Sequence, residues 1–514
     1  MSKPKEKPPA ATEGSNNNNI TCPQGSDAAA ASQPRNVSFW PSDMDDTPLP
    51  PVQAPKPPSM PTSDVGDLVP PGLVGEVAQY IYSSAVRPVR EIALGAALGL
   101  VAGIAGRAYN VSGTGLNQYL LVVAGTGTGK EDGVKGIERL LAALRRQVPA
   151  VDDFIGPGAF ASGQGLIRTL DKQPSIFCML GEFGLTLQML NDPRAPSSTQ
   201  LLKRALLDLY SKSGWDDVLR STAYSDSEKD TKIVFAPALS FVGDTTPETL
   251  YDALSPRDIA SGLLPRMTII EYKGKRPDRN ARNGTPPDRA VVEHLTSLAQ
   301  SALAMRNDNR NMPVLANPAG QAVLDGFDKE CDTRMRDDGA SVVNKELWNR
   351  AHLKALKVAA LLAVGIDHHS PVITETVALW AIEFTKRSTR DVLGRFEAGE
   401  VGTGEARQEA ELKRIASDYL RLSPKARLHG SYAVPEKLAM AREALSVSYL
   451  RKRAAQCSAF NYNRKGFDGA FKSTLEALCD SGWLFKMDKN IVHLKFGPRM
   501  GDVYVIGANF RPVD

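Results

Sequence analysis

The chain has 514 residues, enough for two to four domains at roughly 100–200 residues each. Hydrophobic residues make up 42% of it and charged residues 23%, which excludes a collagen-like or wholly disordered protein. The net charge of +4 is uneven, because residues 407–514 hold 19 Lys and Arg against 11 Asp and Glu while the rest of the chain is slightly acidic.

Residues 1–65 are rich in proline and have no aromatic side chains besides Phe39 and Trp40. Such a segment buries too little apolar surface to offset the entropy of ordering, so we predict a disordered arm. Two roles stay open for this arm, a plain tail or a segment that binds a partner.

Residues 66–272 have a globular composition in which short apolar runs alternate with helical periods, as in α/β proteins with a parallel sheet. The apolar stretch Ile92–Gly106 is shorter than the about 20 residues that cross a bilayer, so we predict a buried helix and no membrane segment. The predicted strands are Tyr119–Val123, Asp152–Ile155, Ser175–Leu180, Ala238–Gly243 and Met267–Tyr272.

The second half of the chain divides into three predicted regions. Residues 273–289 are rich in Lys, Arg, Asn and Pro and indicate a basic linker, and the apolar spacing of residues 290–400 indicates a helical domain. Residues 405–514 show the order of a winged helix, three helices followed by a hairpin. The helices are expected near Glu409–Leu422, Ser446–Cys457 and Lys465–Ser481, and the strands at Ile491–Phe496 and Val503–Gly507.

A glycine-rich motif between the first predicted strand and an amphipathic helix carries the clearest chemical signal. It reads Ala124-Gly125-Thr126-Gly127-Thr128-Gly129-Lys130-Glu131. Its backbone N–H groups can close around phosphates, and Lys130 can neutralise the β- and γ-phosphates of ATP. Glu131 stands where a Ser or Thr hydroxyl usually binds Mg²⁺. The alternative is a Gly/Thr-rich turn that ends in lysine by chance.

An acidic residue follows the strand Ser175–Leu180, where ligands of open α/β sheets bind. This residue, Glu182, is the candidate base that orients the attacking water. The Asp that usually precedes such a glutamate is Gly181. We therefore expect Glu131 or Glu182 to hold the metal ion, or hydrolysis to be weak. A solvent-exposed strand cap is the alternative role for Glu182.

Two further positions are candidate parts of a nucleotide site. Asp244 follows the strand Ala238–Gly243 and is a candidate nucleotide-binding residue, although turn chemistry explains it equally well. Arg266, and after it Arg257, are candidates for an arginine that a neighbouring subunit supplies to the transferred phosphoryl group. An ordinary surface role is the alternative for both arginines.

The basic C-terminal region predicts DNA binding, with a protein-contact or packing role as the alternative. The candidate DNA-binding residues are Arg451, Lys452, Arg453, Arg464, Lys465 and Lys472. The five cysteines have no pair at C-x-x-C spacing, which predicts neither a zinc ribbon nor a disulfide framework but a cytoplasmic protein. The six histidines have no metal-binding spacing and are expected to be structural.

Taken in order, the motifs resemble a family of P-loop ATPases carried by phages and plasmids and described as replicative or primase-associated helicases. The residues that carry the resemblance are Ile92–Gly99, Gly125–Lys130, Gly181–Gly184, Leu239–Pro247, Gly262–Arg266 and Trp348–Ala359. The resemblance covers most of the chain beyond residue 70. It implies a RecA-like or AAA+ core, ATP on Gly125–Lys130, a catalytic Glu182 and an arginine role for Arg266. Members usually have Ser or Thr at the position of Glu131 and Asp at that of Gly181.

We therefore expect an ATP-dependent DNA motor, a ring-forming replicative helicase of a phage, plasmid or integrated element. It would act as a homo-hexamer or other ring on single-stranded or forked DNA with Mg²⁺, and the arm would recruit a primase or another replication partner. The alternative is a nucleotide-switched replication initiator or loader with weak or no hydrolysis. A transcription activator ranks third, because only the phosphate loop resembles that group.

Overall fold

The computed structural model describes residues 69–514 except 193, 224–229, 253, 255–258, 260, 398–400, 402–404, 430–432, 442, 462–465, 499, 508–509 and 511–514. The predicted arm at residues 1–65 lies outside the described residues. Two large hydrophobic cores are present, one built from residues between Leu73 and Leu393 and the other from residues between Leu412 and Tyr504.

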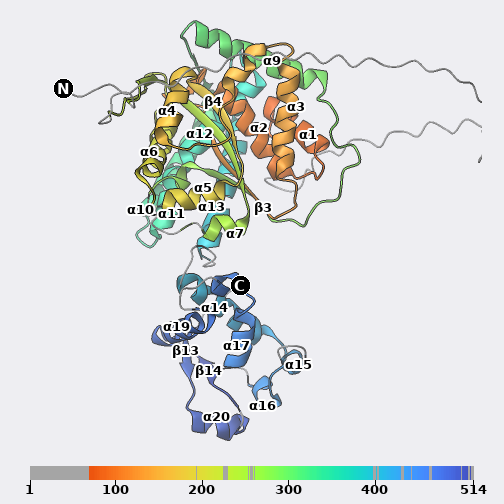
Figure 1. Ribbon diagram of the computed structural model, residues 1–514, viewed down its shortest axis with the longest axis vertical. Helices are drawn as coiled ribbons and strands as arrows, with labels where there is room; N and C mark the ends of the chain where they lie inside the picture. Colours follow the sequence, from red (N-terminus) through yellow and green to blue (C-terminus); the bar gives the residue numbers. More distant parts are fainter. Residues whose placement is uncertain are drawn as a thin grey trace, which may run out of the picture. The chain divides into compact units, whose positions relative to one another are not determined.

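A parallel sheet of four strands lies inside the first core (Figure 1). Its order is β4 (Ser175–Leu180), β7 (Ala238–Thr245), β3 (Tyr119–Ala124) and β8 (Thr268–Tyr272). All four strands were predicted from their apolar runs, and the α/β class with a parallel sheet is confirmed. Because β3 pairs on both sides, the loop that follows it leaves the middle of the sheet.

The fifth predicted strand, at Asp152–Ile155, is wrong. Residues Pro149–Phe154 form a 3₁₀ helix, η1, and only Ile155 bridges β4, at Phe177. The reason is charge, because Asp152 pairs with Arg145 at 2.8 Å and Asp153 pairs with Arg306 at 2.7 Å. Both carboxylates face partners at the surface, so this stretch cannot continue the buried sheet.

Helix α2 (Arg90–Ala105) packs directly on one face of the sheet, and it is the buried helix that the sequence predicts. Three glycines at four-residue spacing, Gly95, Gly99 and Gly103, allow this close approach. A Cβ on Gly103 would lie 2.2 Å from the Cβ of Phe177. Among the described residues, no helix is both long and apolar enough to span a membrane.

Replacing Gly103 with alanine should therefore destabilise the protein by about 1–3 kcal/mol, although alanine is the better helix former. The clash is with Phe177 next to its backbone, so a change of rotamer cannot relieve it. Gly326 is the matched control, because it lies in a helix with nothing within 4 Å of an added Cβ. Thermal unfolding should show a lower melting temperature for Gly103→Ala and an equal or higher one for Gly326→Ala. Equal melting temperatures for both variants would contradict this packing.

Helices α5 (Phe183–Asn191) and α6 (Ser197–Ser211) cover the opposite face of the sheet from α2 (Figure 1). Phe183 stacks on Phe241 with ring centroids 5.1 Å apart, and Tyr210 meets Tyr119 edge-on at 5.1 Å. The first core also contains α1 (Leu73–Ser84), β1 (Tyr109–Val111), β2 (Thr114–Gly115), α3 (Glu131–Leu144), α4 (Gly163–Lys172), β5 (Val218–Leu219), β6 (Val234–Phe235), α7 (Pro247–Asp252) and η3 (Leu264–Arg266).

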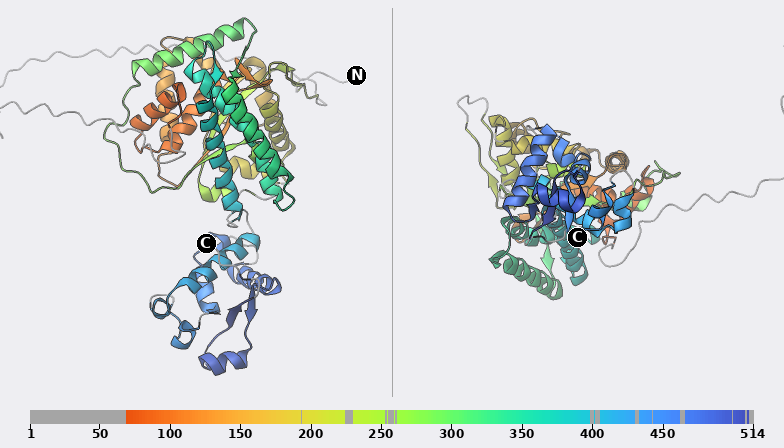
Figure 2. Two further views of the ribbon diagram at one scale, coloured as in Figure 1. Left: turned by 180° about the vertical axis from the view of Figure 1, so that it is seen from behind. Right: turned by 90° about the horizontal axis from the view of Figure 1, so that it is seen from below.

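Residues 289–397 are largely helical, as the sequence predicts, and they share the first hydrophobic core with the sheet (Figure 2, green to blue-green). Their elements are α9 (Arg289–Asn307), β9 (Met312–Pro313), β10 (Leu315–Ala316), α10 (Pro318–Arg336), α11 (Val342–Asn349), α12 (Ala351–Ile366), β11 (Val372–Ile373) and α13 (Glu375–Glu397). Strand β9 pairs with β1. These helices therefore complete the core of the α/β region.

Helix α12 places two lysines inside this core. Lys354 is 2% exposed and donates a hydrogen bond to the carbonyl of Met267 at 3.2 Å. Lys357 is 0% exposed and donates to Asn117 Oδ1 at 2.6 Å and to the carbonyl of Tyr210 at 3.2 Å. Burial lowers the pKa of Lys354 to about 8 and that of Lys357 to about 7.

Replacing Lys357 with methionine should remove a pH dependence of stability. Between the pKa of about 7 in the folded chain and the ordinary 10.5, unfolding takes up a proton at this lysine. Wild-type stability should therefore rise with pH across this window, by up to about 1.4 kcal/mol per pH unit, and lose that gain as the pH falls toward 7. The melting temperature of wild type relative to that of Lys357→Met should therefore be higher at pH 9 than at pH 7. The same difference at both pH values would contradict a neutral, buried lysine.

The second core, in residues 405–510, combines helices with a small antiparallel sheet of order β12-β14-β13. The three predicted helices are confirmed as α14 (Glu405–Arg421), α17 (Val447–Ala454) and α19 (Gly466–Asp480). The remaining elements are α15 (Pro424–Leu428), α16 (Glu436–Ala439), β12 (Ala444–Ser446), α18 (Ser458–Asn461), β13 (Leu484–Lys486), α20 (Lys489–Phe496) and β14 (Val503–Ile506).

The strand predicted at Ile491–Phe496 is wrong, because these residues belong to helix α20. The Asp488 side chain caps this helix by accepting a hydrogen bond from the Asn490 N–H at 2.8 Å. Only Val492 is buried, while Leu494 is 85% exposed, so most of this run does not contribute to the core. The predicted strand at Val503–Gly507 is confirmed as β14, whose partners are β12 and β13.

Candidate nucleotide-binding site

The phosphate loop, Gly125–Lys130, leads from the end of β3 into α3. Gly127 and Gly129 have φ values of 75° and 95°, a left-handed region that glycine adopts without strain. A Cβ on Gly129 would also lie 2.8 Å from the carboxylate of Asp132. The Thr128 hydroxyl donates to the carbonyl of Gly125 at 2.7 Å and closes the turn. The loop therefore depends on glycine at these two positions.

Two residues that the sequence analysis missed fix the loop to its surroundings. The carboxylate of Asp132, in the first turn of α3, is buried and accepts a hydrogen bond from the backbone N–H of Arg87 at 2.9 Å. Asp132 has a sequence signal, since acidic residues favour the first turn of a helix. Arg87 has none, because its role depends on a contact across 45 residues.

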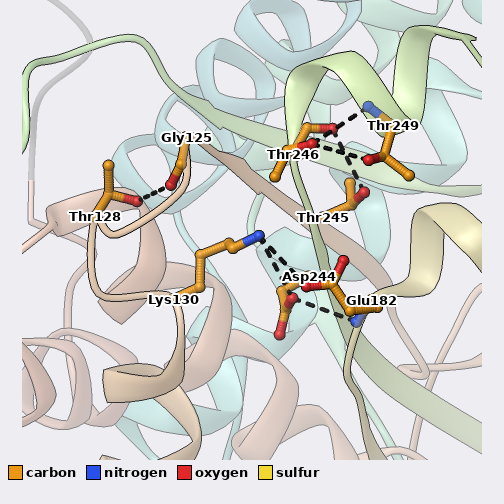
Figure 3. A network of polar contacts seen from close by, with 8 residues as sticks. All are labelled: Gly125, Thr128, Lys130, Glu182, Asp244, Thr245, Thr246 and Thr249. Carbon is orange, nitrogen blue, oxygen red and sulfur yellow. Dashed lines mark hydrogen bonds and ion pairs between the residues drawn. The ribbon is translucent and has the colours of Figure 1, made fainter.

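The carboxyl ends of β3, β4 and β7 bring three of the predicted site residues together (Figure 3). The Lys130 ammonium lies 4.0 Å from a carboxylate oxygen of Glu182 and 4.0 Å from one of Asp244. Asp244 also accepts a hydrogen bond from the backbone N–H of Glu182 at 3.4 Å. The site thus pairs one partly buried lysine with two carboxylates, at the sheet edge where ligands of α/β proteins bind.

The surroundings of the two carboxylates differ. Burial raises the pKa of Asp244, while the ammonium of Lys130 and the hydrogen bond from Glu182 act in the opposite direction. Glu182 has a side chain that is 61% exposed and a left-handed backbone with φ 48° and ψ 41°. Such a backbone is strained in a residue other than glycine, and strain of this kind gathers at functional sites. Glu182 is therefore the carboxylate that water and a ligand can reach.

A pocket of about 390 Å³ opens beside these groups, within the size range of small-ligand sites. It is lined by Val86, Arg87, Thr126, Gly127, Gly129, Lys130, Glu131, Asp132, Lys135, Glu182 and Thr246. Glu131 lies at its rim, where its side chain is 85% exposed and pairs with Lys135 at 3.0 Å. Glu131 and Glu182 thus both line the pocket, and Asp244 is joined to Glu182 by the hydrogen bond from the Glu182 backbone N–H.

The structure does not bring Arg266 to this pocket. Arg266 precedes β8, whose parallel register with β3 pairs Thr268 with Leu120 and Tyr272 with Ala124. It thus lies at the amino ends of the strands, about 17–20 Å from the phosphate loop for strands of this length. Its guanidinium is half-buried and donates to the carbonyl of Gly262 at 2.7 Å. Arg257 lies outside the described residues.

Two of the candidate DNA-binding residues, Arg451 on α17 and Lys472 on α19, line a groove of about 640 Å³ that acidic residues also line. Arg451 pairs with Asp468 at 2.5 Å, and Lys472 lies 3.9 Å from Glu476. The groove is therefore not uniformly basic. Of the other candidates, Lys452 and Arg453 lie on α17, while Arg464 and Lys465 lie outside the described residues.

Comparison of the chain with models of known protein families and with curated protein sequences finds no match. Within the described part of the chain, no group of three or more His, Cys, Asp or Glu side chains is arranged to hold a metal ion. The geometry of the pocket therefore carries the functional argument.

Proposed function

We propose that the chain is an ATPase whose nucleotide site is the pocket beside the phosphate loop. The observation that carries the proposal is Lys130, which lies 4.0 Å from both Glu182 and Asp244 at the carboxyl edge of the sheet. In this role Lys130 neutralises phosphate charge and Glu182 orients the attacking water. The core would then be of the RecA-like or AAA+ kind that the motif order suggests.

Asp244 and Glu182 fit a magnesium ion that arrives with the nucleotide. Mg²⁺ usually binds one or two carboxylates together with substrate phosphates and water, so a cluster of three protein ligands is not required. When bound, the ion would neutralise charge on the phosphates. Glu131 fits this role less well, because its carboxylate is already paired with Lys135.

We further propose that the ATPase drives movement on DNA, as a ring-forming replicative helicase with a winged-helix-like C-terminal region. The support is the order of motifs and the positive charge of residues 407–514. The ion pairs of Arg451 and Lys472 weaken the case for DNA in the groove. The exposed Lys452 on α17 is the better candidate for a contact with DNA. Arg266 would reach a neighbouring subunit's nucleotide in such a ring.

The second candidate function is a nucleotide-switched initiator or loader that hydrolyses ATP slowly or not at all. It is favoured by Gly181, which offers no carboxylate although an added Cβ there would meet nothing within 4 Å. There is therefore space for a larger side chain at position 181, but the glycine found there supplies no carboxylate.

ATP turnover with Mg²⁺, measured with and without single-stranded DNA, tests the proposal and separates the two candidates. DNA-stimulated turnover, followed by ATP-dependent strand separation, would support the motor. ATP binding without turnover on any DNA, together with tight binding to a duplex site, would support the switch. Failure to bind ATP would refute both.

A further inference from the structure

The segment 273–288, for which the sequence indicates a linker, is fixed beside the phosphate loop. The backbone N–H of Asn280 donates to the carbonyl of Val86 at 2.9 Å, and its side chain donates to the carbonyls of Ser83 and Ala85 at 2.7 and 2.9 Å. The N–H of Gly284 donates to the carbonyl of Ser84 at 2.8 Å. The segment therefore follows the connection between α1 and α2 that also supplies Arg87 to the pocket.

Within this segment Arg276 lies against the phosphate loop. Its guanidinium Cζ and Nε are each 3.6 Å from the position that a Cβ on Gly127 would take. The residues on both sides are held, because the carbonyl of Lys275 accepts from the Tyr272 hydroxyl at 2.6 Å and that of Pro277 from the Arg87 guanidinium at 2.5 Å. The backbone at Arg276 is thus held in place, and its side chain extends to the phosphate loop.

The three basic side chains that line the pocket already interact with other groups of the protein. Lys135 is paired with Glu131, and the Arg87 guanidinium donates to a carbonyl. Lys130 faces two carboxylates and is partly neutralised by them. By contrast, the exposed guanidinium of Arg276 has no hydrogen bond or ion pair to any residue that the structure describes. A bound triphosphate adds several negative charges to a pocket in which three acidic side chains already balance the three basic ones.

We propose that Arg276 binds the phosphate chain of the nucleotide held by its own subunit, an inference that rests on the proposed ATP site. The planar guanidinium can make two parallel hydrogen bonds to phosphate oxygens, which lysine cannot. Arginine can supply this charge within one subunit or across a boundary. Arg276 is placed for the first arrangement, because the segment 273–288 is anchored to the end of α1 and to the connection that follows it in the same subunit, and the Arg276 side chain lies beside Gly127 of that subunit.

The test measures the dissociation constants of ATP and ADP, by competition with a fluorescent nucleotide, in a Glu182→Gln background that suppresses turnover. Arg276→Ala should weaken ATP binding about 10- to 100-fold, as for a lost charged hydrogen bond. Arg276→Lys should retain part of the affinity, because it keeps the charge but not the paired hydrogen bonds. The control Arg279→Ala, an exposed arginine of the same segment, should stay within twofold of the background.

Each outcome points to one of the two proposals. If the background protein binds no ATP, or if Lys130→Ala binds it equally well, the proposed ATP site itself fails. If ATP binding is intact and depends on Lys130 but Arg276→Ala matches Arg279→Ala, only the inference about Arg276 is overturned. In the wild-type background, at an ATP concentration too low to fill the Arg276→Ala site, a mixture of Lys130→Ala and Arg276→Ala chains should turn over ATP no faster than the two variants measured separately. Recovery of turnover in the mixture would place Arg276 in a neighbour's site and refute the same-subunit assignment.

Discussion

Replacing Lys130 with alanine should weaken ATP binding by about 100-fold or more and reduce turnover to background. The side chain is 13% exposed, and its ammonium lies 4.0 Å from a carboxylate oxygen of Glu182 and 4.0 Å from one of Asp244. Without it, two carboxylates would face the phosphates without an intervening cation. Losing one partner of a partly buried charge cluster costs about 2–5 kcal/mol, which corresponds to this loss of affinity.

Lys232→Ala is the matched control for this variant. Lys232 is also a lysine paired with a carboxylate, that of Asp171 at 3.2 Å, but its side chain is 80% exposed and it does not line the pocket. Calorimetric titration with ATP should leave this control at wild-type affinity. If Lys130→Ala and Lys232→Ala both bind ATP as wild type does, the phosphate loop is not a nucleotide site.

The sequence predicted the sheet well because its strands are mainly apolar, although β8 also contains Glu271. Ser175–Leu180 and the residues around Phe241 have no charge to direct them to the surface, so burial between helices is their main option. The two wrong strands are short runs of mixed character. Asp152 and Asp153 form ion pairs, and Ile491–Phe496 follows a capping Asp488, a helix signal that outweighs the four apolar residues among these six.

The site was predictable only as far as its motifs are local. Gly125–Lys130 and Glu182 each follow a strand, so their meeting at one edge follows from a parallel sheet. The contacts of Arg87 with Asp132 and Pro277 join segments that are 45 and 190 residues apart. Spacing along the chain carries no information on such contacts, because they depend on how α1 and α3 pack. For the same reason Arg266, close to the other motifs in sequence, lies at the opposite edge.

Replacing Glu182 with glutamine should reduce ATP turnover by about 10²- to 10⁴-fold, the usual contribution of a general base, while ATP affinity is retained. The backbone of Glu182 is held in place because its N–H donates to Asp244 and because α5 approaches β7 closely at Gly184. Glutamine fills the same space but cannot accept the proton of the attacking water. It also removes one negative charge that faces the phosphates, so ATP should remain bound and unhydrolysed.

Single-turnover measurements separate this effect from a loss of binding. Glu138→Gln is the matched control, an exposed glutamate on α3 that does not line the pocket, and it should turn over ATP as wild type does. Turnover of Glu182→Gln within threefold of wild type would remove Glu182 from the reaction and leave Asp244 as the remaining carboxylate beside Lys130. Because burial raises the pKa of Asp244, the turnover of such an enzyme would fall as the pH is lowered toward that raised pKa, since the carboxylate would then become protonated. A pH profile of turnover measured on an active Glu182→Gln variant would therefore report the titration of Asp244.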